Sequence, residues 1–256
     1  MKIIDLSVTI EDRTPCDPPS MPTTIDYVDH AQGAEHMKQF FPTATEADLP
    51  DGLGWALEYV HLTTHSGTHM DAPWHFHPTM NHGEPARTID QIPLEWCISD
   101  GVLLDFSSKG DGYRIMAKDV ETELSRIGYS LKPLDIVLVR SGAQTRWGSA
   151  DYLTAGCGMS REATLYLLEK GVKIVGTDAW SWDRPLGLIN QDFEKTRDAS
   201  LIWEGHFAGI EKEYFQMEKL TNLDRLPPFG FTVSCLPIKI KAASAGWCRT
   251  IAMLNS

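Results

Sequence analysis

Asp135-Ile136-Val137-Leu138-Val139-Arg140 is a continuous apolar run, and Val172-Lys173-Ile174-Val175-Gly176-Thr177 is a second run of this kind further along the chain. Each is typical of a buried strand. Between them, helical spacing extends from Ser160, a candidate N-cap, to Gly171, where a glycine ends the pattern. A strand, a helix and a second strand in this order predict a βαβ unit with parallel pairing. We therefore expect an α/β protein.

Further strands and another helix are predicted on either side of this unit. Residues Ala117 to Ile127 have apolar side chains at helical spacing and precede Gly128, a residue type common at helix ends. Strands are expected at Lys2–Ile10, Ala56–Thr63, Gly101–Phe106, Phe231–Cys235, Ile238–Lys241 and Arg249–Leu254. These elements predict a mixed sheet. The length of 256 residues suits a single domain spanning residues 1–256.

The segment from Glu11 to Gly54 differs from the rest because it is rich in proline and has only broken apolar periodicity. We predict an irregular region here, with a short helix around Met37 to Phe41. A loop of this length in a compact domain usually lines a site or mediates contacts. Its aromatic and apolar residues favour a pocket wall or a subunit contact.

Composition argues against several classes of function. A formal net charge of -12 and a pI near 5.1 do not suit a nucleic-acid partner, because phosphate binding relies on clustered Lys and Arg. We find neither a run of about 18 apolar residues nor a secretory signal pattern, so we predict no membrane partner. The five cysteines are scattered and form no Cys-x-x-Cys pair, which is typical of reduced thiols. We expect a cytoplasmic protein.

The chemistry is concentrated in His65-Ser66-Gly67-Thr68-His69-Met70-Asp71-Ala72-Pro73-Trp74-His75-Phe76-His77, a window with four histidines and one aspartate. A His-x-x-x-His-x-Asp run can place two imidazoles and one carboxylate around one divalent ion. Catalytic zinc sites typically have three protein ligands and an open position, whereas structural sites have four ligands and usually include cysteine. No cysteine lies in this window, so the pattern predicts a catalytic metal site at a strand end and in the following turn.

The motif His-x-Gly-Thr-His-x-Asp-Ala-Pro-x-His resembles the signature of the metal-dependent cyclase family, which includes bacterial kynurenine formamidase and isatin hydrolase. It matches at every signature position, and the resemblance extends over essentially the whole chain. It implies that His65, His69 and Asp71 bind metal and that His75 is the catalytic acid and base. It also implies a β/β/α layered domain of the swivelling type.

A distal segment supports the resemblance. Glu204-Gly205-His206-Phe207-Ala208-Gly209, followed by Glu218-Lys219-Leu220, is similar to the family's distal His and Glu pair. In the formamidase branch this pair joins the shared aspartate around a second metal, so the resemblance implies that His206 and Glu218 are also ligands. We expect a divalent metal, zinc or manganese by preference, with one or two ions per chain. His77, two residues after His75, is a candidate substrate-binding residue.

Gly176 to Asp183 follows the end of a predicted strand, where α/β sheets usually gather ligands. Two interpretations remain open. Asp178 and Ser181 cap a turn while Asp183 is solvated, or the run orients the histidine ligands, as a similar run in the family suggests. The tryptophans near this region either form an aromatic pocket wall or belong to the core. They are Trp180, Trp182 and Trp203.

Three functions compete for the metal site. The first is hydrolysis of a small amide, lactam or aryl formamide by metal-activated water, with His75 as the proton shuttle. The second is a non-haem iron oxygenase, because two histidines and one carboxylate also form the facial triad that binds Fe(II). The third is a metal-storing or substrate-binding module without turnover. The extra histidine at position 75 and the family resemblance favour hydrolysis.

The N-terminal segment departs from the formamidase pattern. That branch typically has a tryptophan shortly before a Pro-Gly-Asp turn, whereas this chain reads Arg13-Thr14-Pro15-Cys16-Asp17-Pro18 and has no tryptophan before Trp55. We therefore expect a cyclic or aryl amide other than N-formylkynurenine as substrate. The long segment from Asp29 to Gly54 can reshape the pocket or reach a neighbouring subunit, so we expect a homodimer or homotetramer.

Overall fold

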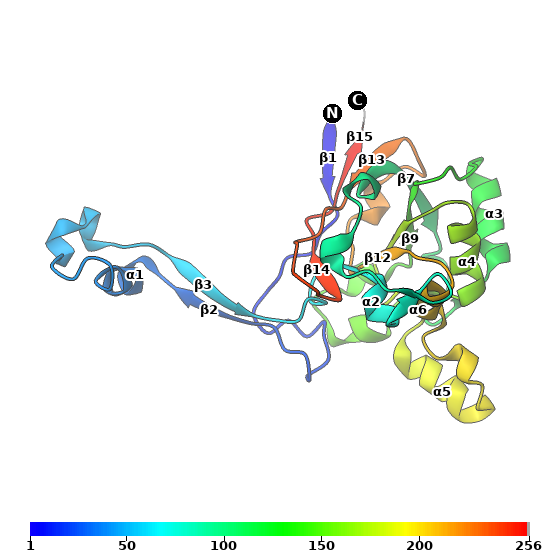
Figure 1. The fold of residues 1–256 in the computed structure, drawn as a ribbon, viewed down its shortest axis with the longest axis horizontal. Helices are drawn as coiled ribbons and strands as arrows, with labels where there is room; N and C mark the ends of the chain where they lie inside the picture. Colours follow the sequence, from blue (N-terminus) through cyan, green and yellow to red (C-terminus); the bar gives the residue numbers. More distant parts are fainter. Residues whose placement is uncertain (255–256) are drawn as a thin grey trace.

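A mixed sheet of nine strands forms the centre of the molecule in the computed structural model, which describes residues 1–254 (Figure 1). The strand order is β1-β15-β13-β7-β9-β11-β12-β4-β14. The four middle strands, β7, β9, β11 and β12, are parallel, and the pairs toward both edges are antiparallel. The bounds are β1 Lys2–Asp5, β4 His69–Asp71, β7 Ile98–Asp105, β9 Ile136–Arg140, β11 Ile174–Thr177, β12 Phe215–Glu218, β13 Phe231–Ser234, β14 Ala245–Trp247 and β15 Ile251–Leu254.

The predicted βαβ unit is confirmed. Strands β9 and β11 pair in parallel with Ile136 opposite Ile174, and α4 (Arg161–Glu169) lies between them in the chain. Ser160 caps this helix, because its hydroxyl accepts a hydrogen bond from the Ala163 amide at 3.1 Å. The α/β fold class and the mixed sheet follow from this unit and its neighbours.

The second predicted helix is also confirmed. Helix α3 spans Ala117–Ile127 and ends at Gly128, which has the left-handed φ of 68° that favours glycine. Helices α3 and α4 pack side by side against one face of the sheet (Figure 1). The remaining helices are α1 His30–Met37, α2 Pro73–Phe76, α5 Leu186–Thr196 and α6 Glu204–Phe207. The smaller strands are β2 Thr24–Val28, β3 Leu57–His61, β5 Thr79–Met80, β6 Glu84–Pro85, β8 Arg114–Ile115 and β10 Gly158–Met159.

Alternating side chains of the central strands build two separate cores. Val137 and Val139 pack beneath α3 and α4, while Ile136 and Leu138 belong to the core on the opposite face. Both sets are buried, which explains why this strand is a continuous apolar run in the sequence. The core that contains Ile136 and Leu138 also contains Met70 of β4 and Met217 of β12. Their neighbours in these two strands therefore point to the other face.

Two strand predictions need correction near the sheet edge. Ile238–Lys241 is not a strand, because the chain there makes only an isolated bridge between Pro237 and Cys248 and leaves Ile238 56% exposed. The strand in this region is β14, which pairs with β4. At the N-terminus the strand ends at Asp5 instead of Ile10, since pairing with β15 stops there.

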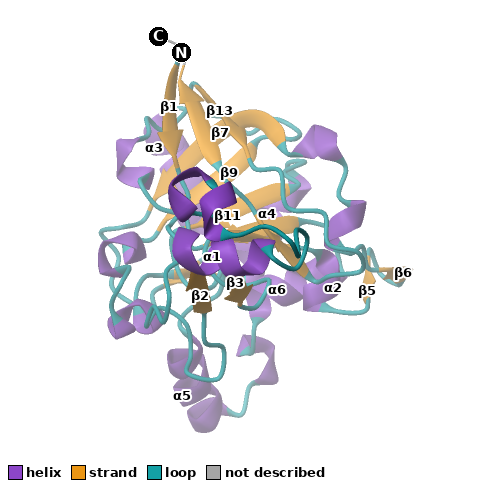
Figure 2. Ribbon diagram, turned by 90° about the vertical axis from the view of Figure 1, so that its left-hand side faces the viewer, coloured by secondary structure: helices purple, strands orange, loops and turns teal. Residues whose placement is uncertain are grey.

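A long arm projects from the body and takes up part of the region predicted as irregular at Glu11–Gly54, of which residues 11–23 and 38–45 are irregular as predicted (Figure 1). Its stem is an antiparallel ribbon of β2 and β3, with Thr24 opposite His61. The predicted strand at Ala56–Thr63 is therefore present as β3, but it pairs outside the central sheet. The arm comes toward the viewer in Figure 2, in front of the sheet.

The helix at the arm's tip was predicted at the wrong place. Helix α1 precedes Met37–Phe41 almost entirely, because a capping box fixes its start at Asp29. The Asp29 carboxylate accepts a hydrogen bond from the Gln32 amide at 2.9 Å, and the Gln32 side chain accepts one from the Asp29 amide at 3.0 Å. Within residues 1–254, none of the helices combines the length and apolar character that crossing a membrane requires.

Candidate metal centre and active site

Strand register brings the polar side chains of the site together. Strands β4 and β12 are antiparallel, with His69 opposite Glu218 and Asp71 opposite Gln216. These four residues lie on one face of the sheet, because Met70 and Met217 between them point into the core on the other face. A strand pair with two polar residues on each strand therefore forms the floor of the site.

The ligands were predicted at the end of the strand expected over 56–63 and in the turn after it, which is right for His65, in the turn after β3, and wrong for His69 and Asp71. His69 and Asp71 lie within β4 and are fully buried. His65 precedes the strand in a turn that contains Gly67, whose φ of 63° favours glycine. His75 follows the strand on the short helix α2. The turn therefore lies between β3 and β4, and it places His65 beside Asp71 on the polar face of β4.

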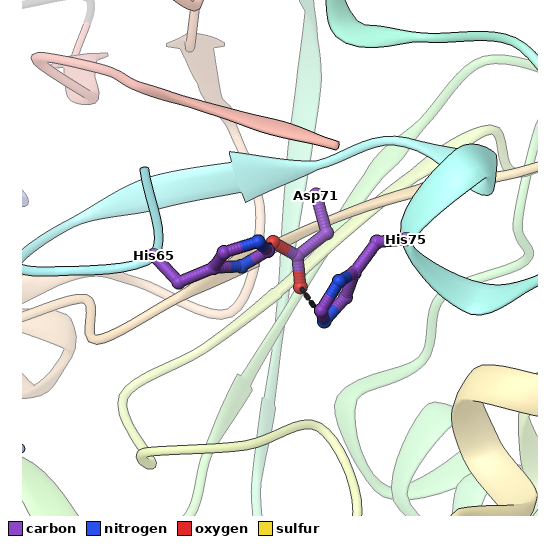
Figure 3. Close-up of side chains that lie close together, drawn as sticks. All are labelled: His65, Asp71 and His75. Atoms are coloured by element: carbon purple, nitrogen blue, oxygen red, sulfur yellow. Dashed lines mark ion pairs between the residues drawn. The ribbon is translucent and has the colours of Figure 1, made fainter. Parts of the chain in front are cut away.

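Asp71 is the centre of the cluster. Its Oδ1 lies 2.8 Å from Nδ1 of His65 and 3.2 Å from Nε2 of His69. Its Oδ2 lies 4.0 Å from Nε2 of His75 and 3.9 Å from Nε2 of His206. Figure 3 shows the Asp71 carboxylate between the rings of His65 and His75. Four imidazoles thus surround one carboxylate.

Two of these imidazoles are oriented by hydrogen bonds at the ring nitrogen that does not face Asp71. Nδ1 of His69 lies 2.8 Å from the Gly67 carbonyl oxygen, to which it donates, so Nε2 faces Asp71. Nε2 of His65 lies 3.0 Å from Oγ of Ser244, which leaves Nδ1 for Asp71. Ser244 was not expected from the sequence, because it lies far from the motif in the chain.

Asp183 holds His206, which decides between the two interpretations of the Gly176–Asp183 run. Oδ2 of Asp183 lies 2.5 Å from Nδ1 of His206, and both side chains are buried. The same carboxylate accepts a hydrogen bond from the Gly205 amide at 2.7 Å. Asp183 is thus not solvated but orients a predicted ligand. Asp178, by contrast, accepts hydrogen bonds from the Ser141 backbone and hydroxyl and shapes the neighbouring loop.

Two buried atoms of the cluster lack hydrogen-bond partners, and this supports a cation between them. Within residues 1–254 they are Nε2 of His69 and Oδ1 of Asp71, whose approach to Nδ1 of His65 at 2.8 Å is an ion-pair contact without hydrogen-bond geometry. Buried polar atoms are normally paired, and both atoms offer a lone pair that a divalent ion would accept. In the part of the chain that the structure describes, two compact groups could hold an ion: His65, Asp71 and His75, and His69, Asp71 and Glu218. The donor set fits a divalent cation, and Asp71 belongs to both groups.

Charge and burial shift the protonation states of Asp71 and His75. Burial opposes ionisation of Asp71, but the imidazoles of His65, His75 and His69 outweigh it and hold the pKa of this carboxyl well below its usual range. Burial, reinforced by the neighbouring imidazoles against the attraction of Asp71, lowers the pKa of His75 to about 3. At neutral pH, Asp71 is therefore ionised and His75 is neutral.

Sequence reasoning missed Gln216, which is fully buried in the centre of the distal ligands. Its Nε2 lies 2.6 Å from Nε2 of His206, 2.9 Å from Oε1 of Glu218 and 3.2 Å from Oδ2 of Asp71. The alternation in Phe215-Gln216-Met217-Glu218 could have indicated it, because polar residues at period two share a strand face. This amide lies among the three side chains that were expected to hold a second ion.

A cavity of about 280 Å³ opens beside the cluster. His65, His75, His206 and Glu218 line one side of it, and Trp180 and Trp203 contribute aromatic walls. Trp182 instead belongs to the core, where it is 1% exposed.

The structure does not bring His77 to this cavity, as far as the described residues lining it show. Its Nδ1 lies 2.9 Å from Oγ1 of Thr79, in the turn after α2. Substrate binding by His77 stays a prediction.

Fold and site together define a class: an α/β protein with a buried centre of histidines and carboxylates that is suited to a divalent cation beside an aromatic-walled cavity. Comparison with known proteins is more specific. The chain belongs to the Cyclase family, whose model, described as "Putative cyclase", matches residues 4–184.

Curated relatives and solved structures agree with this membership. A kynurenine formamidase of Erythrobacter litoralis is 28% identical over 193 residues, which are 74% of this chain and 73% of that protein. An isatin hydrolase of Roseibium aggregatum is 27% identical over 217 residues, 80% of this chain and 77% of that protein. A crystal structure of an isatin hydrolase bound to the product analogue thioisatinate covers 100% of this chain and 93% of its own, with a TM-score of 0.77 at 19% identity. At that identity the likeness shows the fold.

Proposed function

We propose that this protein is a metal-dependent hydrolase that cleaves a carbon–nitrogen bond in a small amide, lactam or aryl formamide. One observation carries the proposal: an ionised, buried Asp71 lies between four imidazoles at the wall of a cavity large enough for a small aromatic molecule. The names of the relatives, kynurenine formamidase and isatin hydrolase, support the same bond type. We take His65, His69 and Asp71 as the first ligand set.

The chain's own residues supply the proton transfers in this proposal. A divalent ion, when bound, lowers the pKa of water toward neutrality and offsets charge on a carbonyl oxygen. His75 is 26% exposed at the side chain and faces the cavity, so it can reach both water and substrate. Because its imidazole is neutral at neutral pH, it can accept a proton from water and then donate it to the leaving nitrogen.

Hydrolysis under nitrogen is the expected result of a substrate screen. We expect the protein loaded with zinc or manganese to hydrolyse at least one of several aryl formamides, isatins and lactams. N-formylkynurenine is expected to be a poor substrate, below a kcat/KM of about 10⁴ per molar per second. Absorbance of the released amine measures the reaction.

Other outcomes of this screen have clear meanings. Efficient turnover of N-formylkynurenine would contradict the substrate preference but not the reaction type. Oxygen consumption with iron, without hydrolysis under nitrogen, would favour the non-haem oxygenase. Metal binding with no turnover of any kind would favour a binding module.

The number of ions is a second part of the proposal. We propose one ion at low supply and a second at higher supply, the second held by Asp71, His206 and Glu218. The Gln216 amide lies among these three side chains, so a second ion requires it to move. Gln216→Ala is therefore expected to bind the second ion more tightly than the unaltered protein, and Glu218→Ala is expected to stop at one ion.

Equilibrium dialysis with metal analysis measures both variants. A fully loaded protein that never exceeds one ion per chain, together with an active Glu218→Ala variant, would count against the second ion.

We propose further that the arm joins copies of this chain into a homodimer or homotetramer. A two-stranded ribbon alone is marginally stable in water, and the arm exposes large apolar side chains, among them Tyr27 at 64%, Tyr59 at 61% and Phe40 at 68%. Sedimentation velocity is expected to show a dimer or tetramer, and Tyr27→Asp/Tyr59→Asp is expected to shift it toward monomer. An unaltered protein that is monomeric at micromolar concentration would refute this proposal.

A further inference from the structure

A buried ion pair lies in the wall of the cavity, and the proposed reaction does not use it. The side chains of Lys219 and Asp17 are 2% and 5% exposed, and both residues line the cavity. Nζ of Lys219 contacts Oδ1 of Asp17 and donates to the His65 carbonyl oxygen at 2.8 Å. Because removing two charges from water is costly, such a pair is weak evidence for stability. The pair lies beside the predicted metal ligands His65 and Glu218, and this position points to a role in the site.

Lys219 reaches the cavity through an uncommon backbone conformation. Consecutive residues of a strand point to opposite faces, yet Glu218 and Lys219 line the same cavity. The φ of Lys219 is 58°, in the left-handed region that non-glycine residues seldom adopt, and this turn brings its side chain to the side of Glu218. Two hydrogen bonds hold the turn: the Lys219 amide donates to the Ala179 carbonyl at 3.0 Å, and the Thr68 hydroxyl donates to the Lys219 carbonyl at 2.6 Å.

Lys219 and Asp17 each have one hydrogen-bonding group without a hydrogen-bond partner among the described residues. An ammonium group has three donors, and Asp17 and His65 account for two of those on Lys219. Among the described residues, we find no oxygen or nitrogen atom that accepts the third. Oδ2 of Asp17 is buried and has no hydrogen-bond donor. Trp180 donates from Nε1 to the other oxygen, Oδ1, at 3.0 Å, and thereby fixes the carboxylate.

The ammonium lies beside an aromatic ring, with Nζ 5.5 Å from the centre of the Trp180 ring, and apolar side chains line part of the cavity. Met21, Trp180, Leu186 and Trp203 line the same cavity. In such surroundings a hydrogen bond from a charged group to a ligand is stronger than in water, because little solvent competes for the donor. A ligand oxygen at this place would satisfy the third donor of Lys219.

We propose that Lys219 binds an oxygen of the substrate other than the one in the scissile amide, and that Asp17 is the positioning residue that holds the ammonium. This inference rests on the proposed function. It narrows the substrate to an amide that carries a second carbonyl or a carboxylate group. The bond from Lys219 to the His65 carbonyl keeps the ammonium beside the turn that presents the predicted ligand, so the two substrate groups lie near each other.

A pair of matched substrates tests Lys219 as a specificity residue. Formanilide and N-formylanthranilate contain the same scissile formamide, and only the second carries a carboxylate. The variant Asp17→Asn/Lys219→Met removes both charges and so leaves neither one buried alone. We expect it to lower kcat/KM for N-formylanthranilate relative to formanilide by roughly 10-fold to 100-fold, as for the loss of a hydrogen bond to a charged group. The intrinsic reactivities of the two substrates cancel in this ratio.

Controls separate specificity from structure. Asp17→Asn alone keeps Lys219 but removes the carboxylate that holds its ammonium, so it is expected to lose part of the preference for N-formylanthranilate and less than the double variant loses. Equal losses on both substrates in the double variant, with unchanged metal content and circular dichroism, would show a structural role and overturn the inference. Should the double variant not fold, Asp17→Asn/Lys219→Gln keeps a neutral hydrogen bond between the two side chains and allows the same comparison.

A binding measurement distinguishes failure of this inference from failure of the proposed function. If the unaltered protein hydrolyses neither formamide, the proposed function has failed for this substrate class. Calorimetry on the metal-loaded protein then compares anthranilate with aniline. Tighter binding of anthranilate that the double variant loses would support the role of Lys219, and an equal preference in both proteins would overturn it.

Discussion

Asp71→Ala is expected to lose its bound metal and to have no detectable hydrolase activity. Asp71 is fully buried, and each of the two compact groups that could hold an ion includes it. Without this carboxylate, the first ligand set keeps only imidazoles, and water in a site without an ion would keep a pKa near 15.7 instead of about 7. Metal analysis after dialysis and a hydrolysis assay measure the two effects.

Two further variants make this test sharper. Asp71→Asn keeps the size of the side chain but removes its charge, so it separates the loss of charge from the loss of volume. His61→Ala, an exposed histidine at the end of β3, is the matched control and is expected to keep both metal and activity. An Asp71→Ala protein that retains a full complement of metal would show that the ion lies elsewhere.

His75→Ala is expected to keep its metal and fold while kcat falls by about 10²-fold to 10⁴-fold, the usual contribution of a positioned proton-transfer group. His75 lies farther from Asp71 than His65 and His69 do, at 4.0 Å compared with 2.8 Å and 3.2 Å. Rapid-quench or steady-state kinetics on protein of known metal content measure the effect. If His75→Ala loses metal to the same extent as Asp71→Ala, His75 is a ligand, as the compact group of His65, Asp71 and His75 would then indicate.

The pH dependence of stability gives a second readout for His75 in the metal-free protein. Its folded-state pKa of about 3 lies below the value of 6.5 in the unfolded chain. The unfolded chain therefore takes up the proton first as the pH falls, and the stability that neutral His75 allows at pH 7 is lost progressively between about 6.5 and 3. His75→Ala removes this contribution, so its free energy of unfolding is expected to fall less between pH 7 and pH 5.

The central strands and helices could be predicted because local pattern determines them. The apolar run at Asp135–Arg140 predicts a buried strand, and the glycine after α3 predicts a helix end. Neither signal depends on residues elsewhere in the chain. Spacing and resemblance also predicted the site residues of the motif, and the structure brings His65, His69 and His75 together around Asp71, while their roles stay predictions. The strand β4 itself was not predicted, since its three residues become a strand by pairing with β12 and β14, which are distant in the chain.

The contacts that could not be predicted join residues that are distant in the chain. Gln216 faces Asp71 only because β4 and β12 pair in one register, and no local pattern specifies that register. Ser244 and Asp183 contact the histidines from separate loops. Of the arm's ribbon, β3 was predicted and β2 was missed, because the two strands pair only with each other and no core buries one face of them.

The pairing of β4 with β12 also bears on when the site forms. Asp71 and Gln216 are separated by 145 residues, so the proximal histidines emerge from the ribosome long before the strand that completes their surroundings. Closing so long a loop is slow and depends on the intervening strands having formed. Metal capture at the complete site is therefore a late event, and refolding rates should not depend on metal concentration in stopped-flow measurements. On the proposed metal dependence, a cell that makes this protein has to supply the ion to an already folded chain.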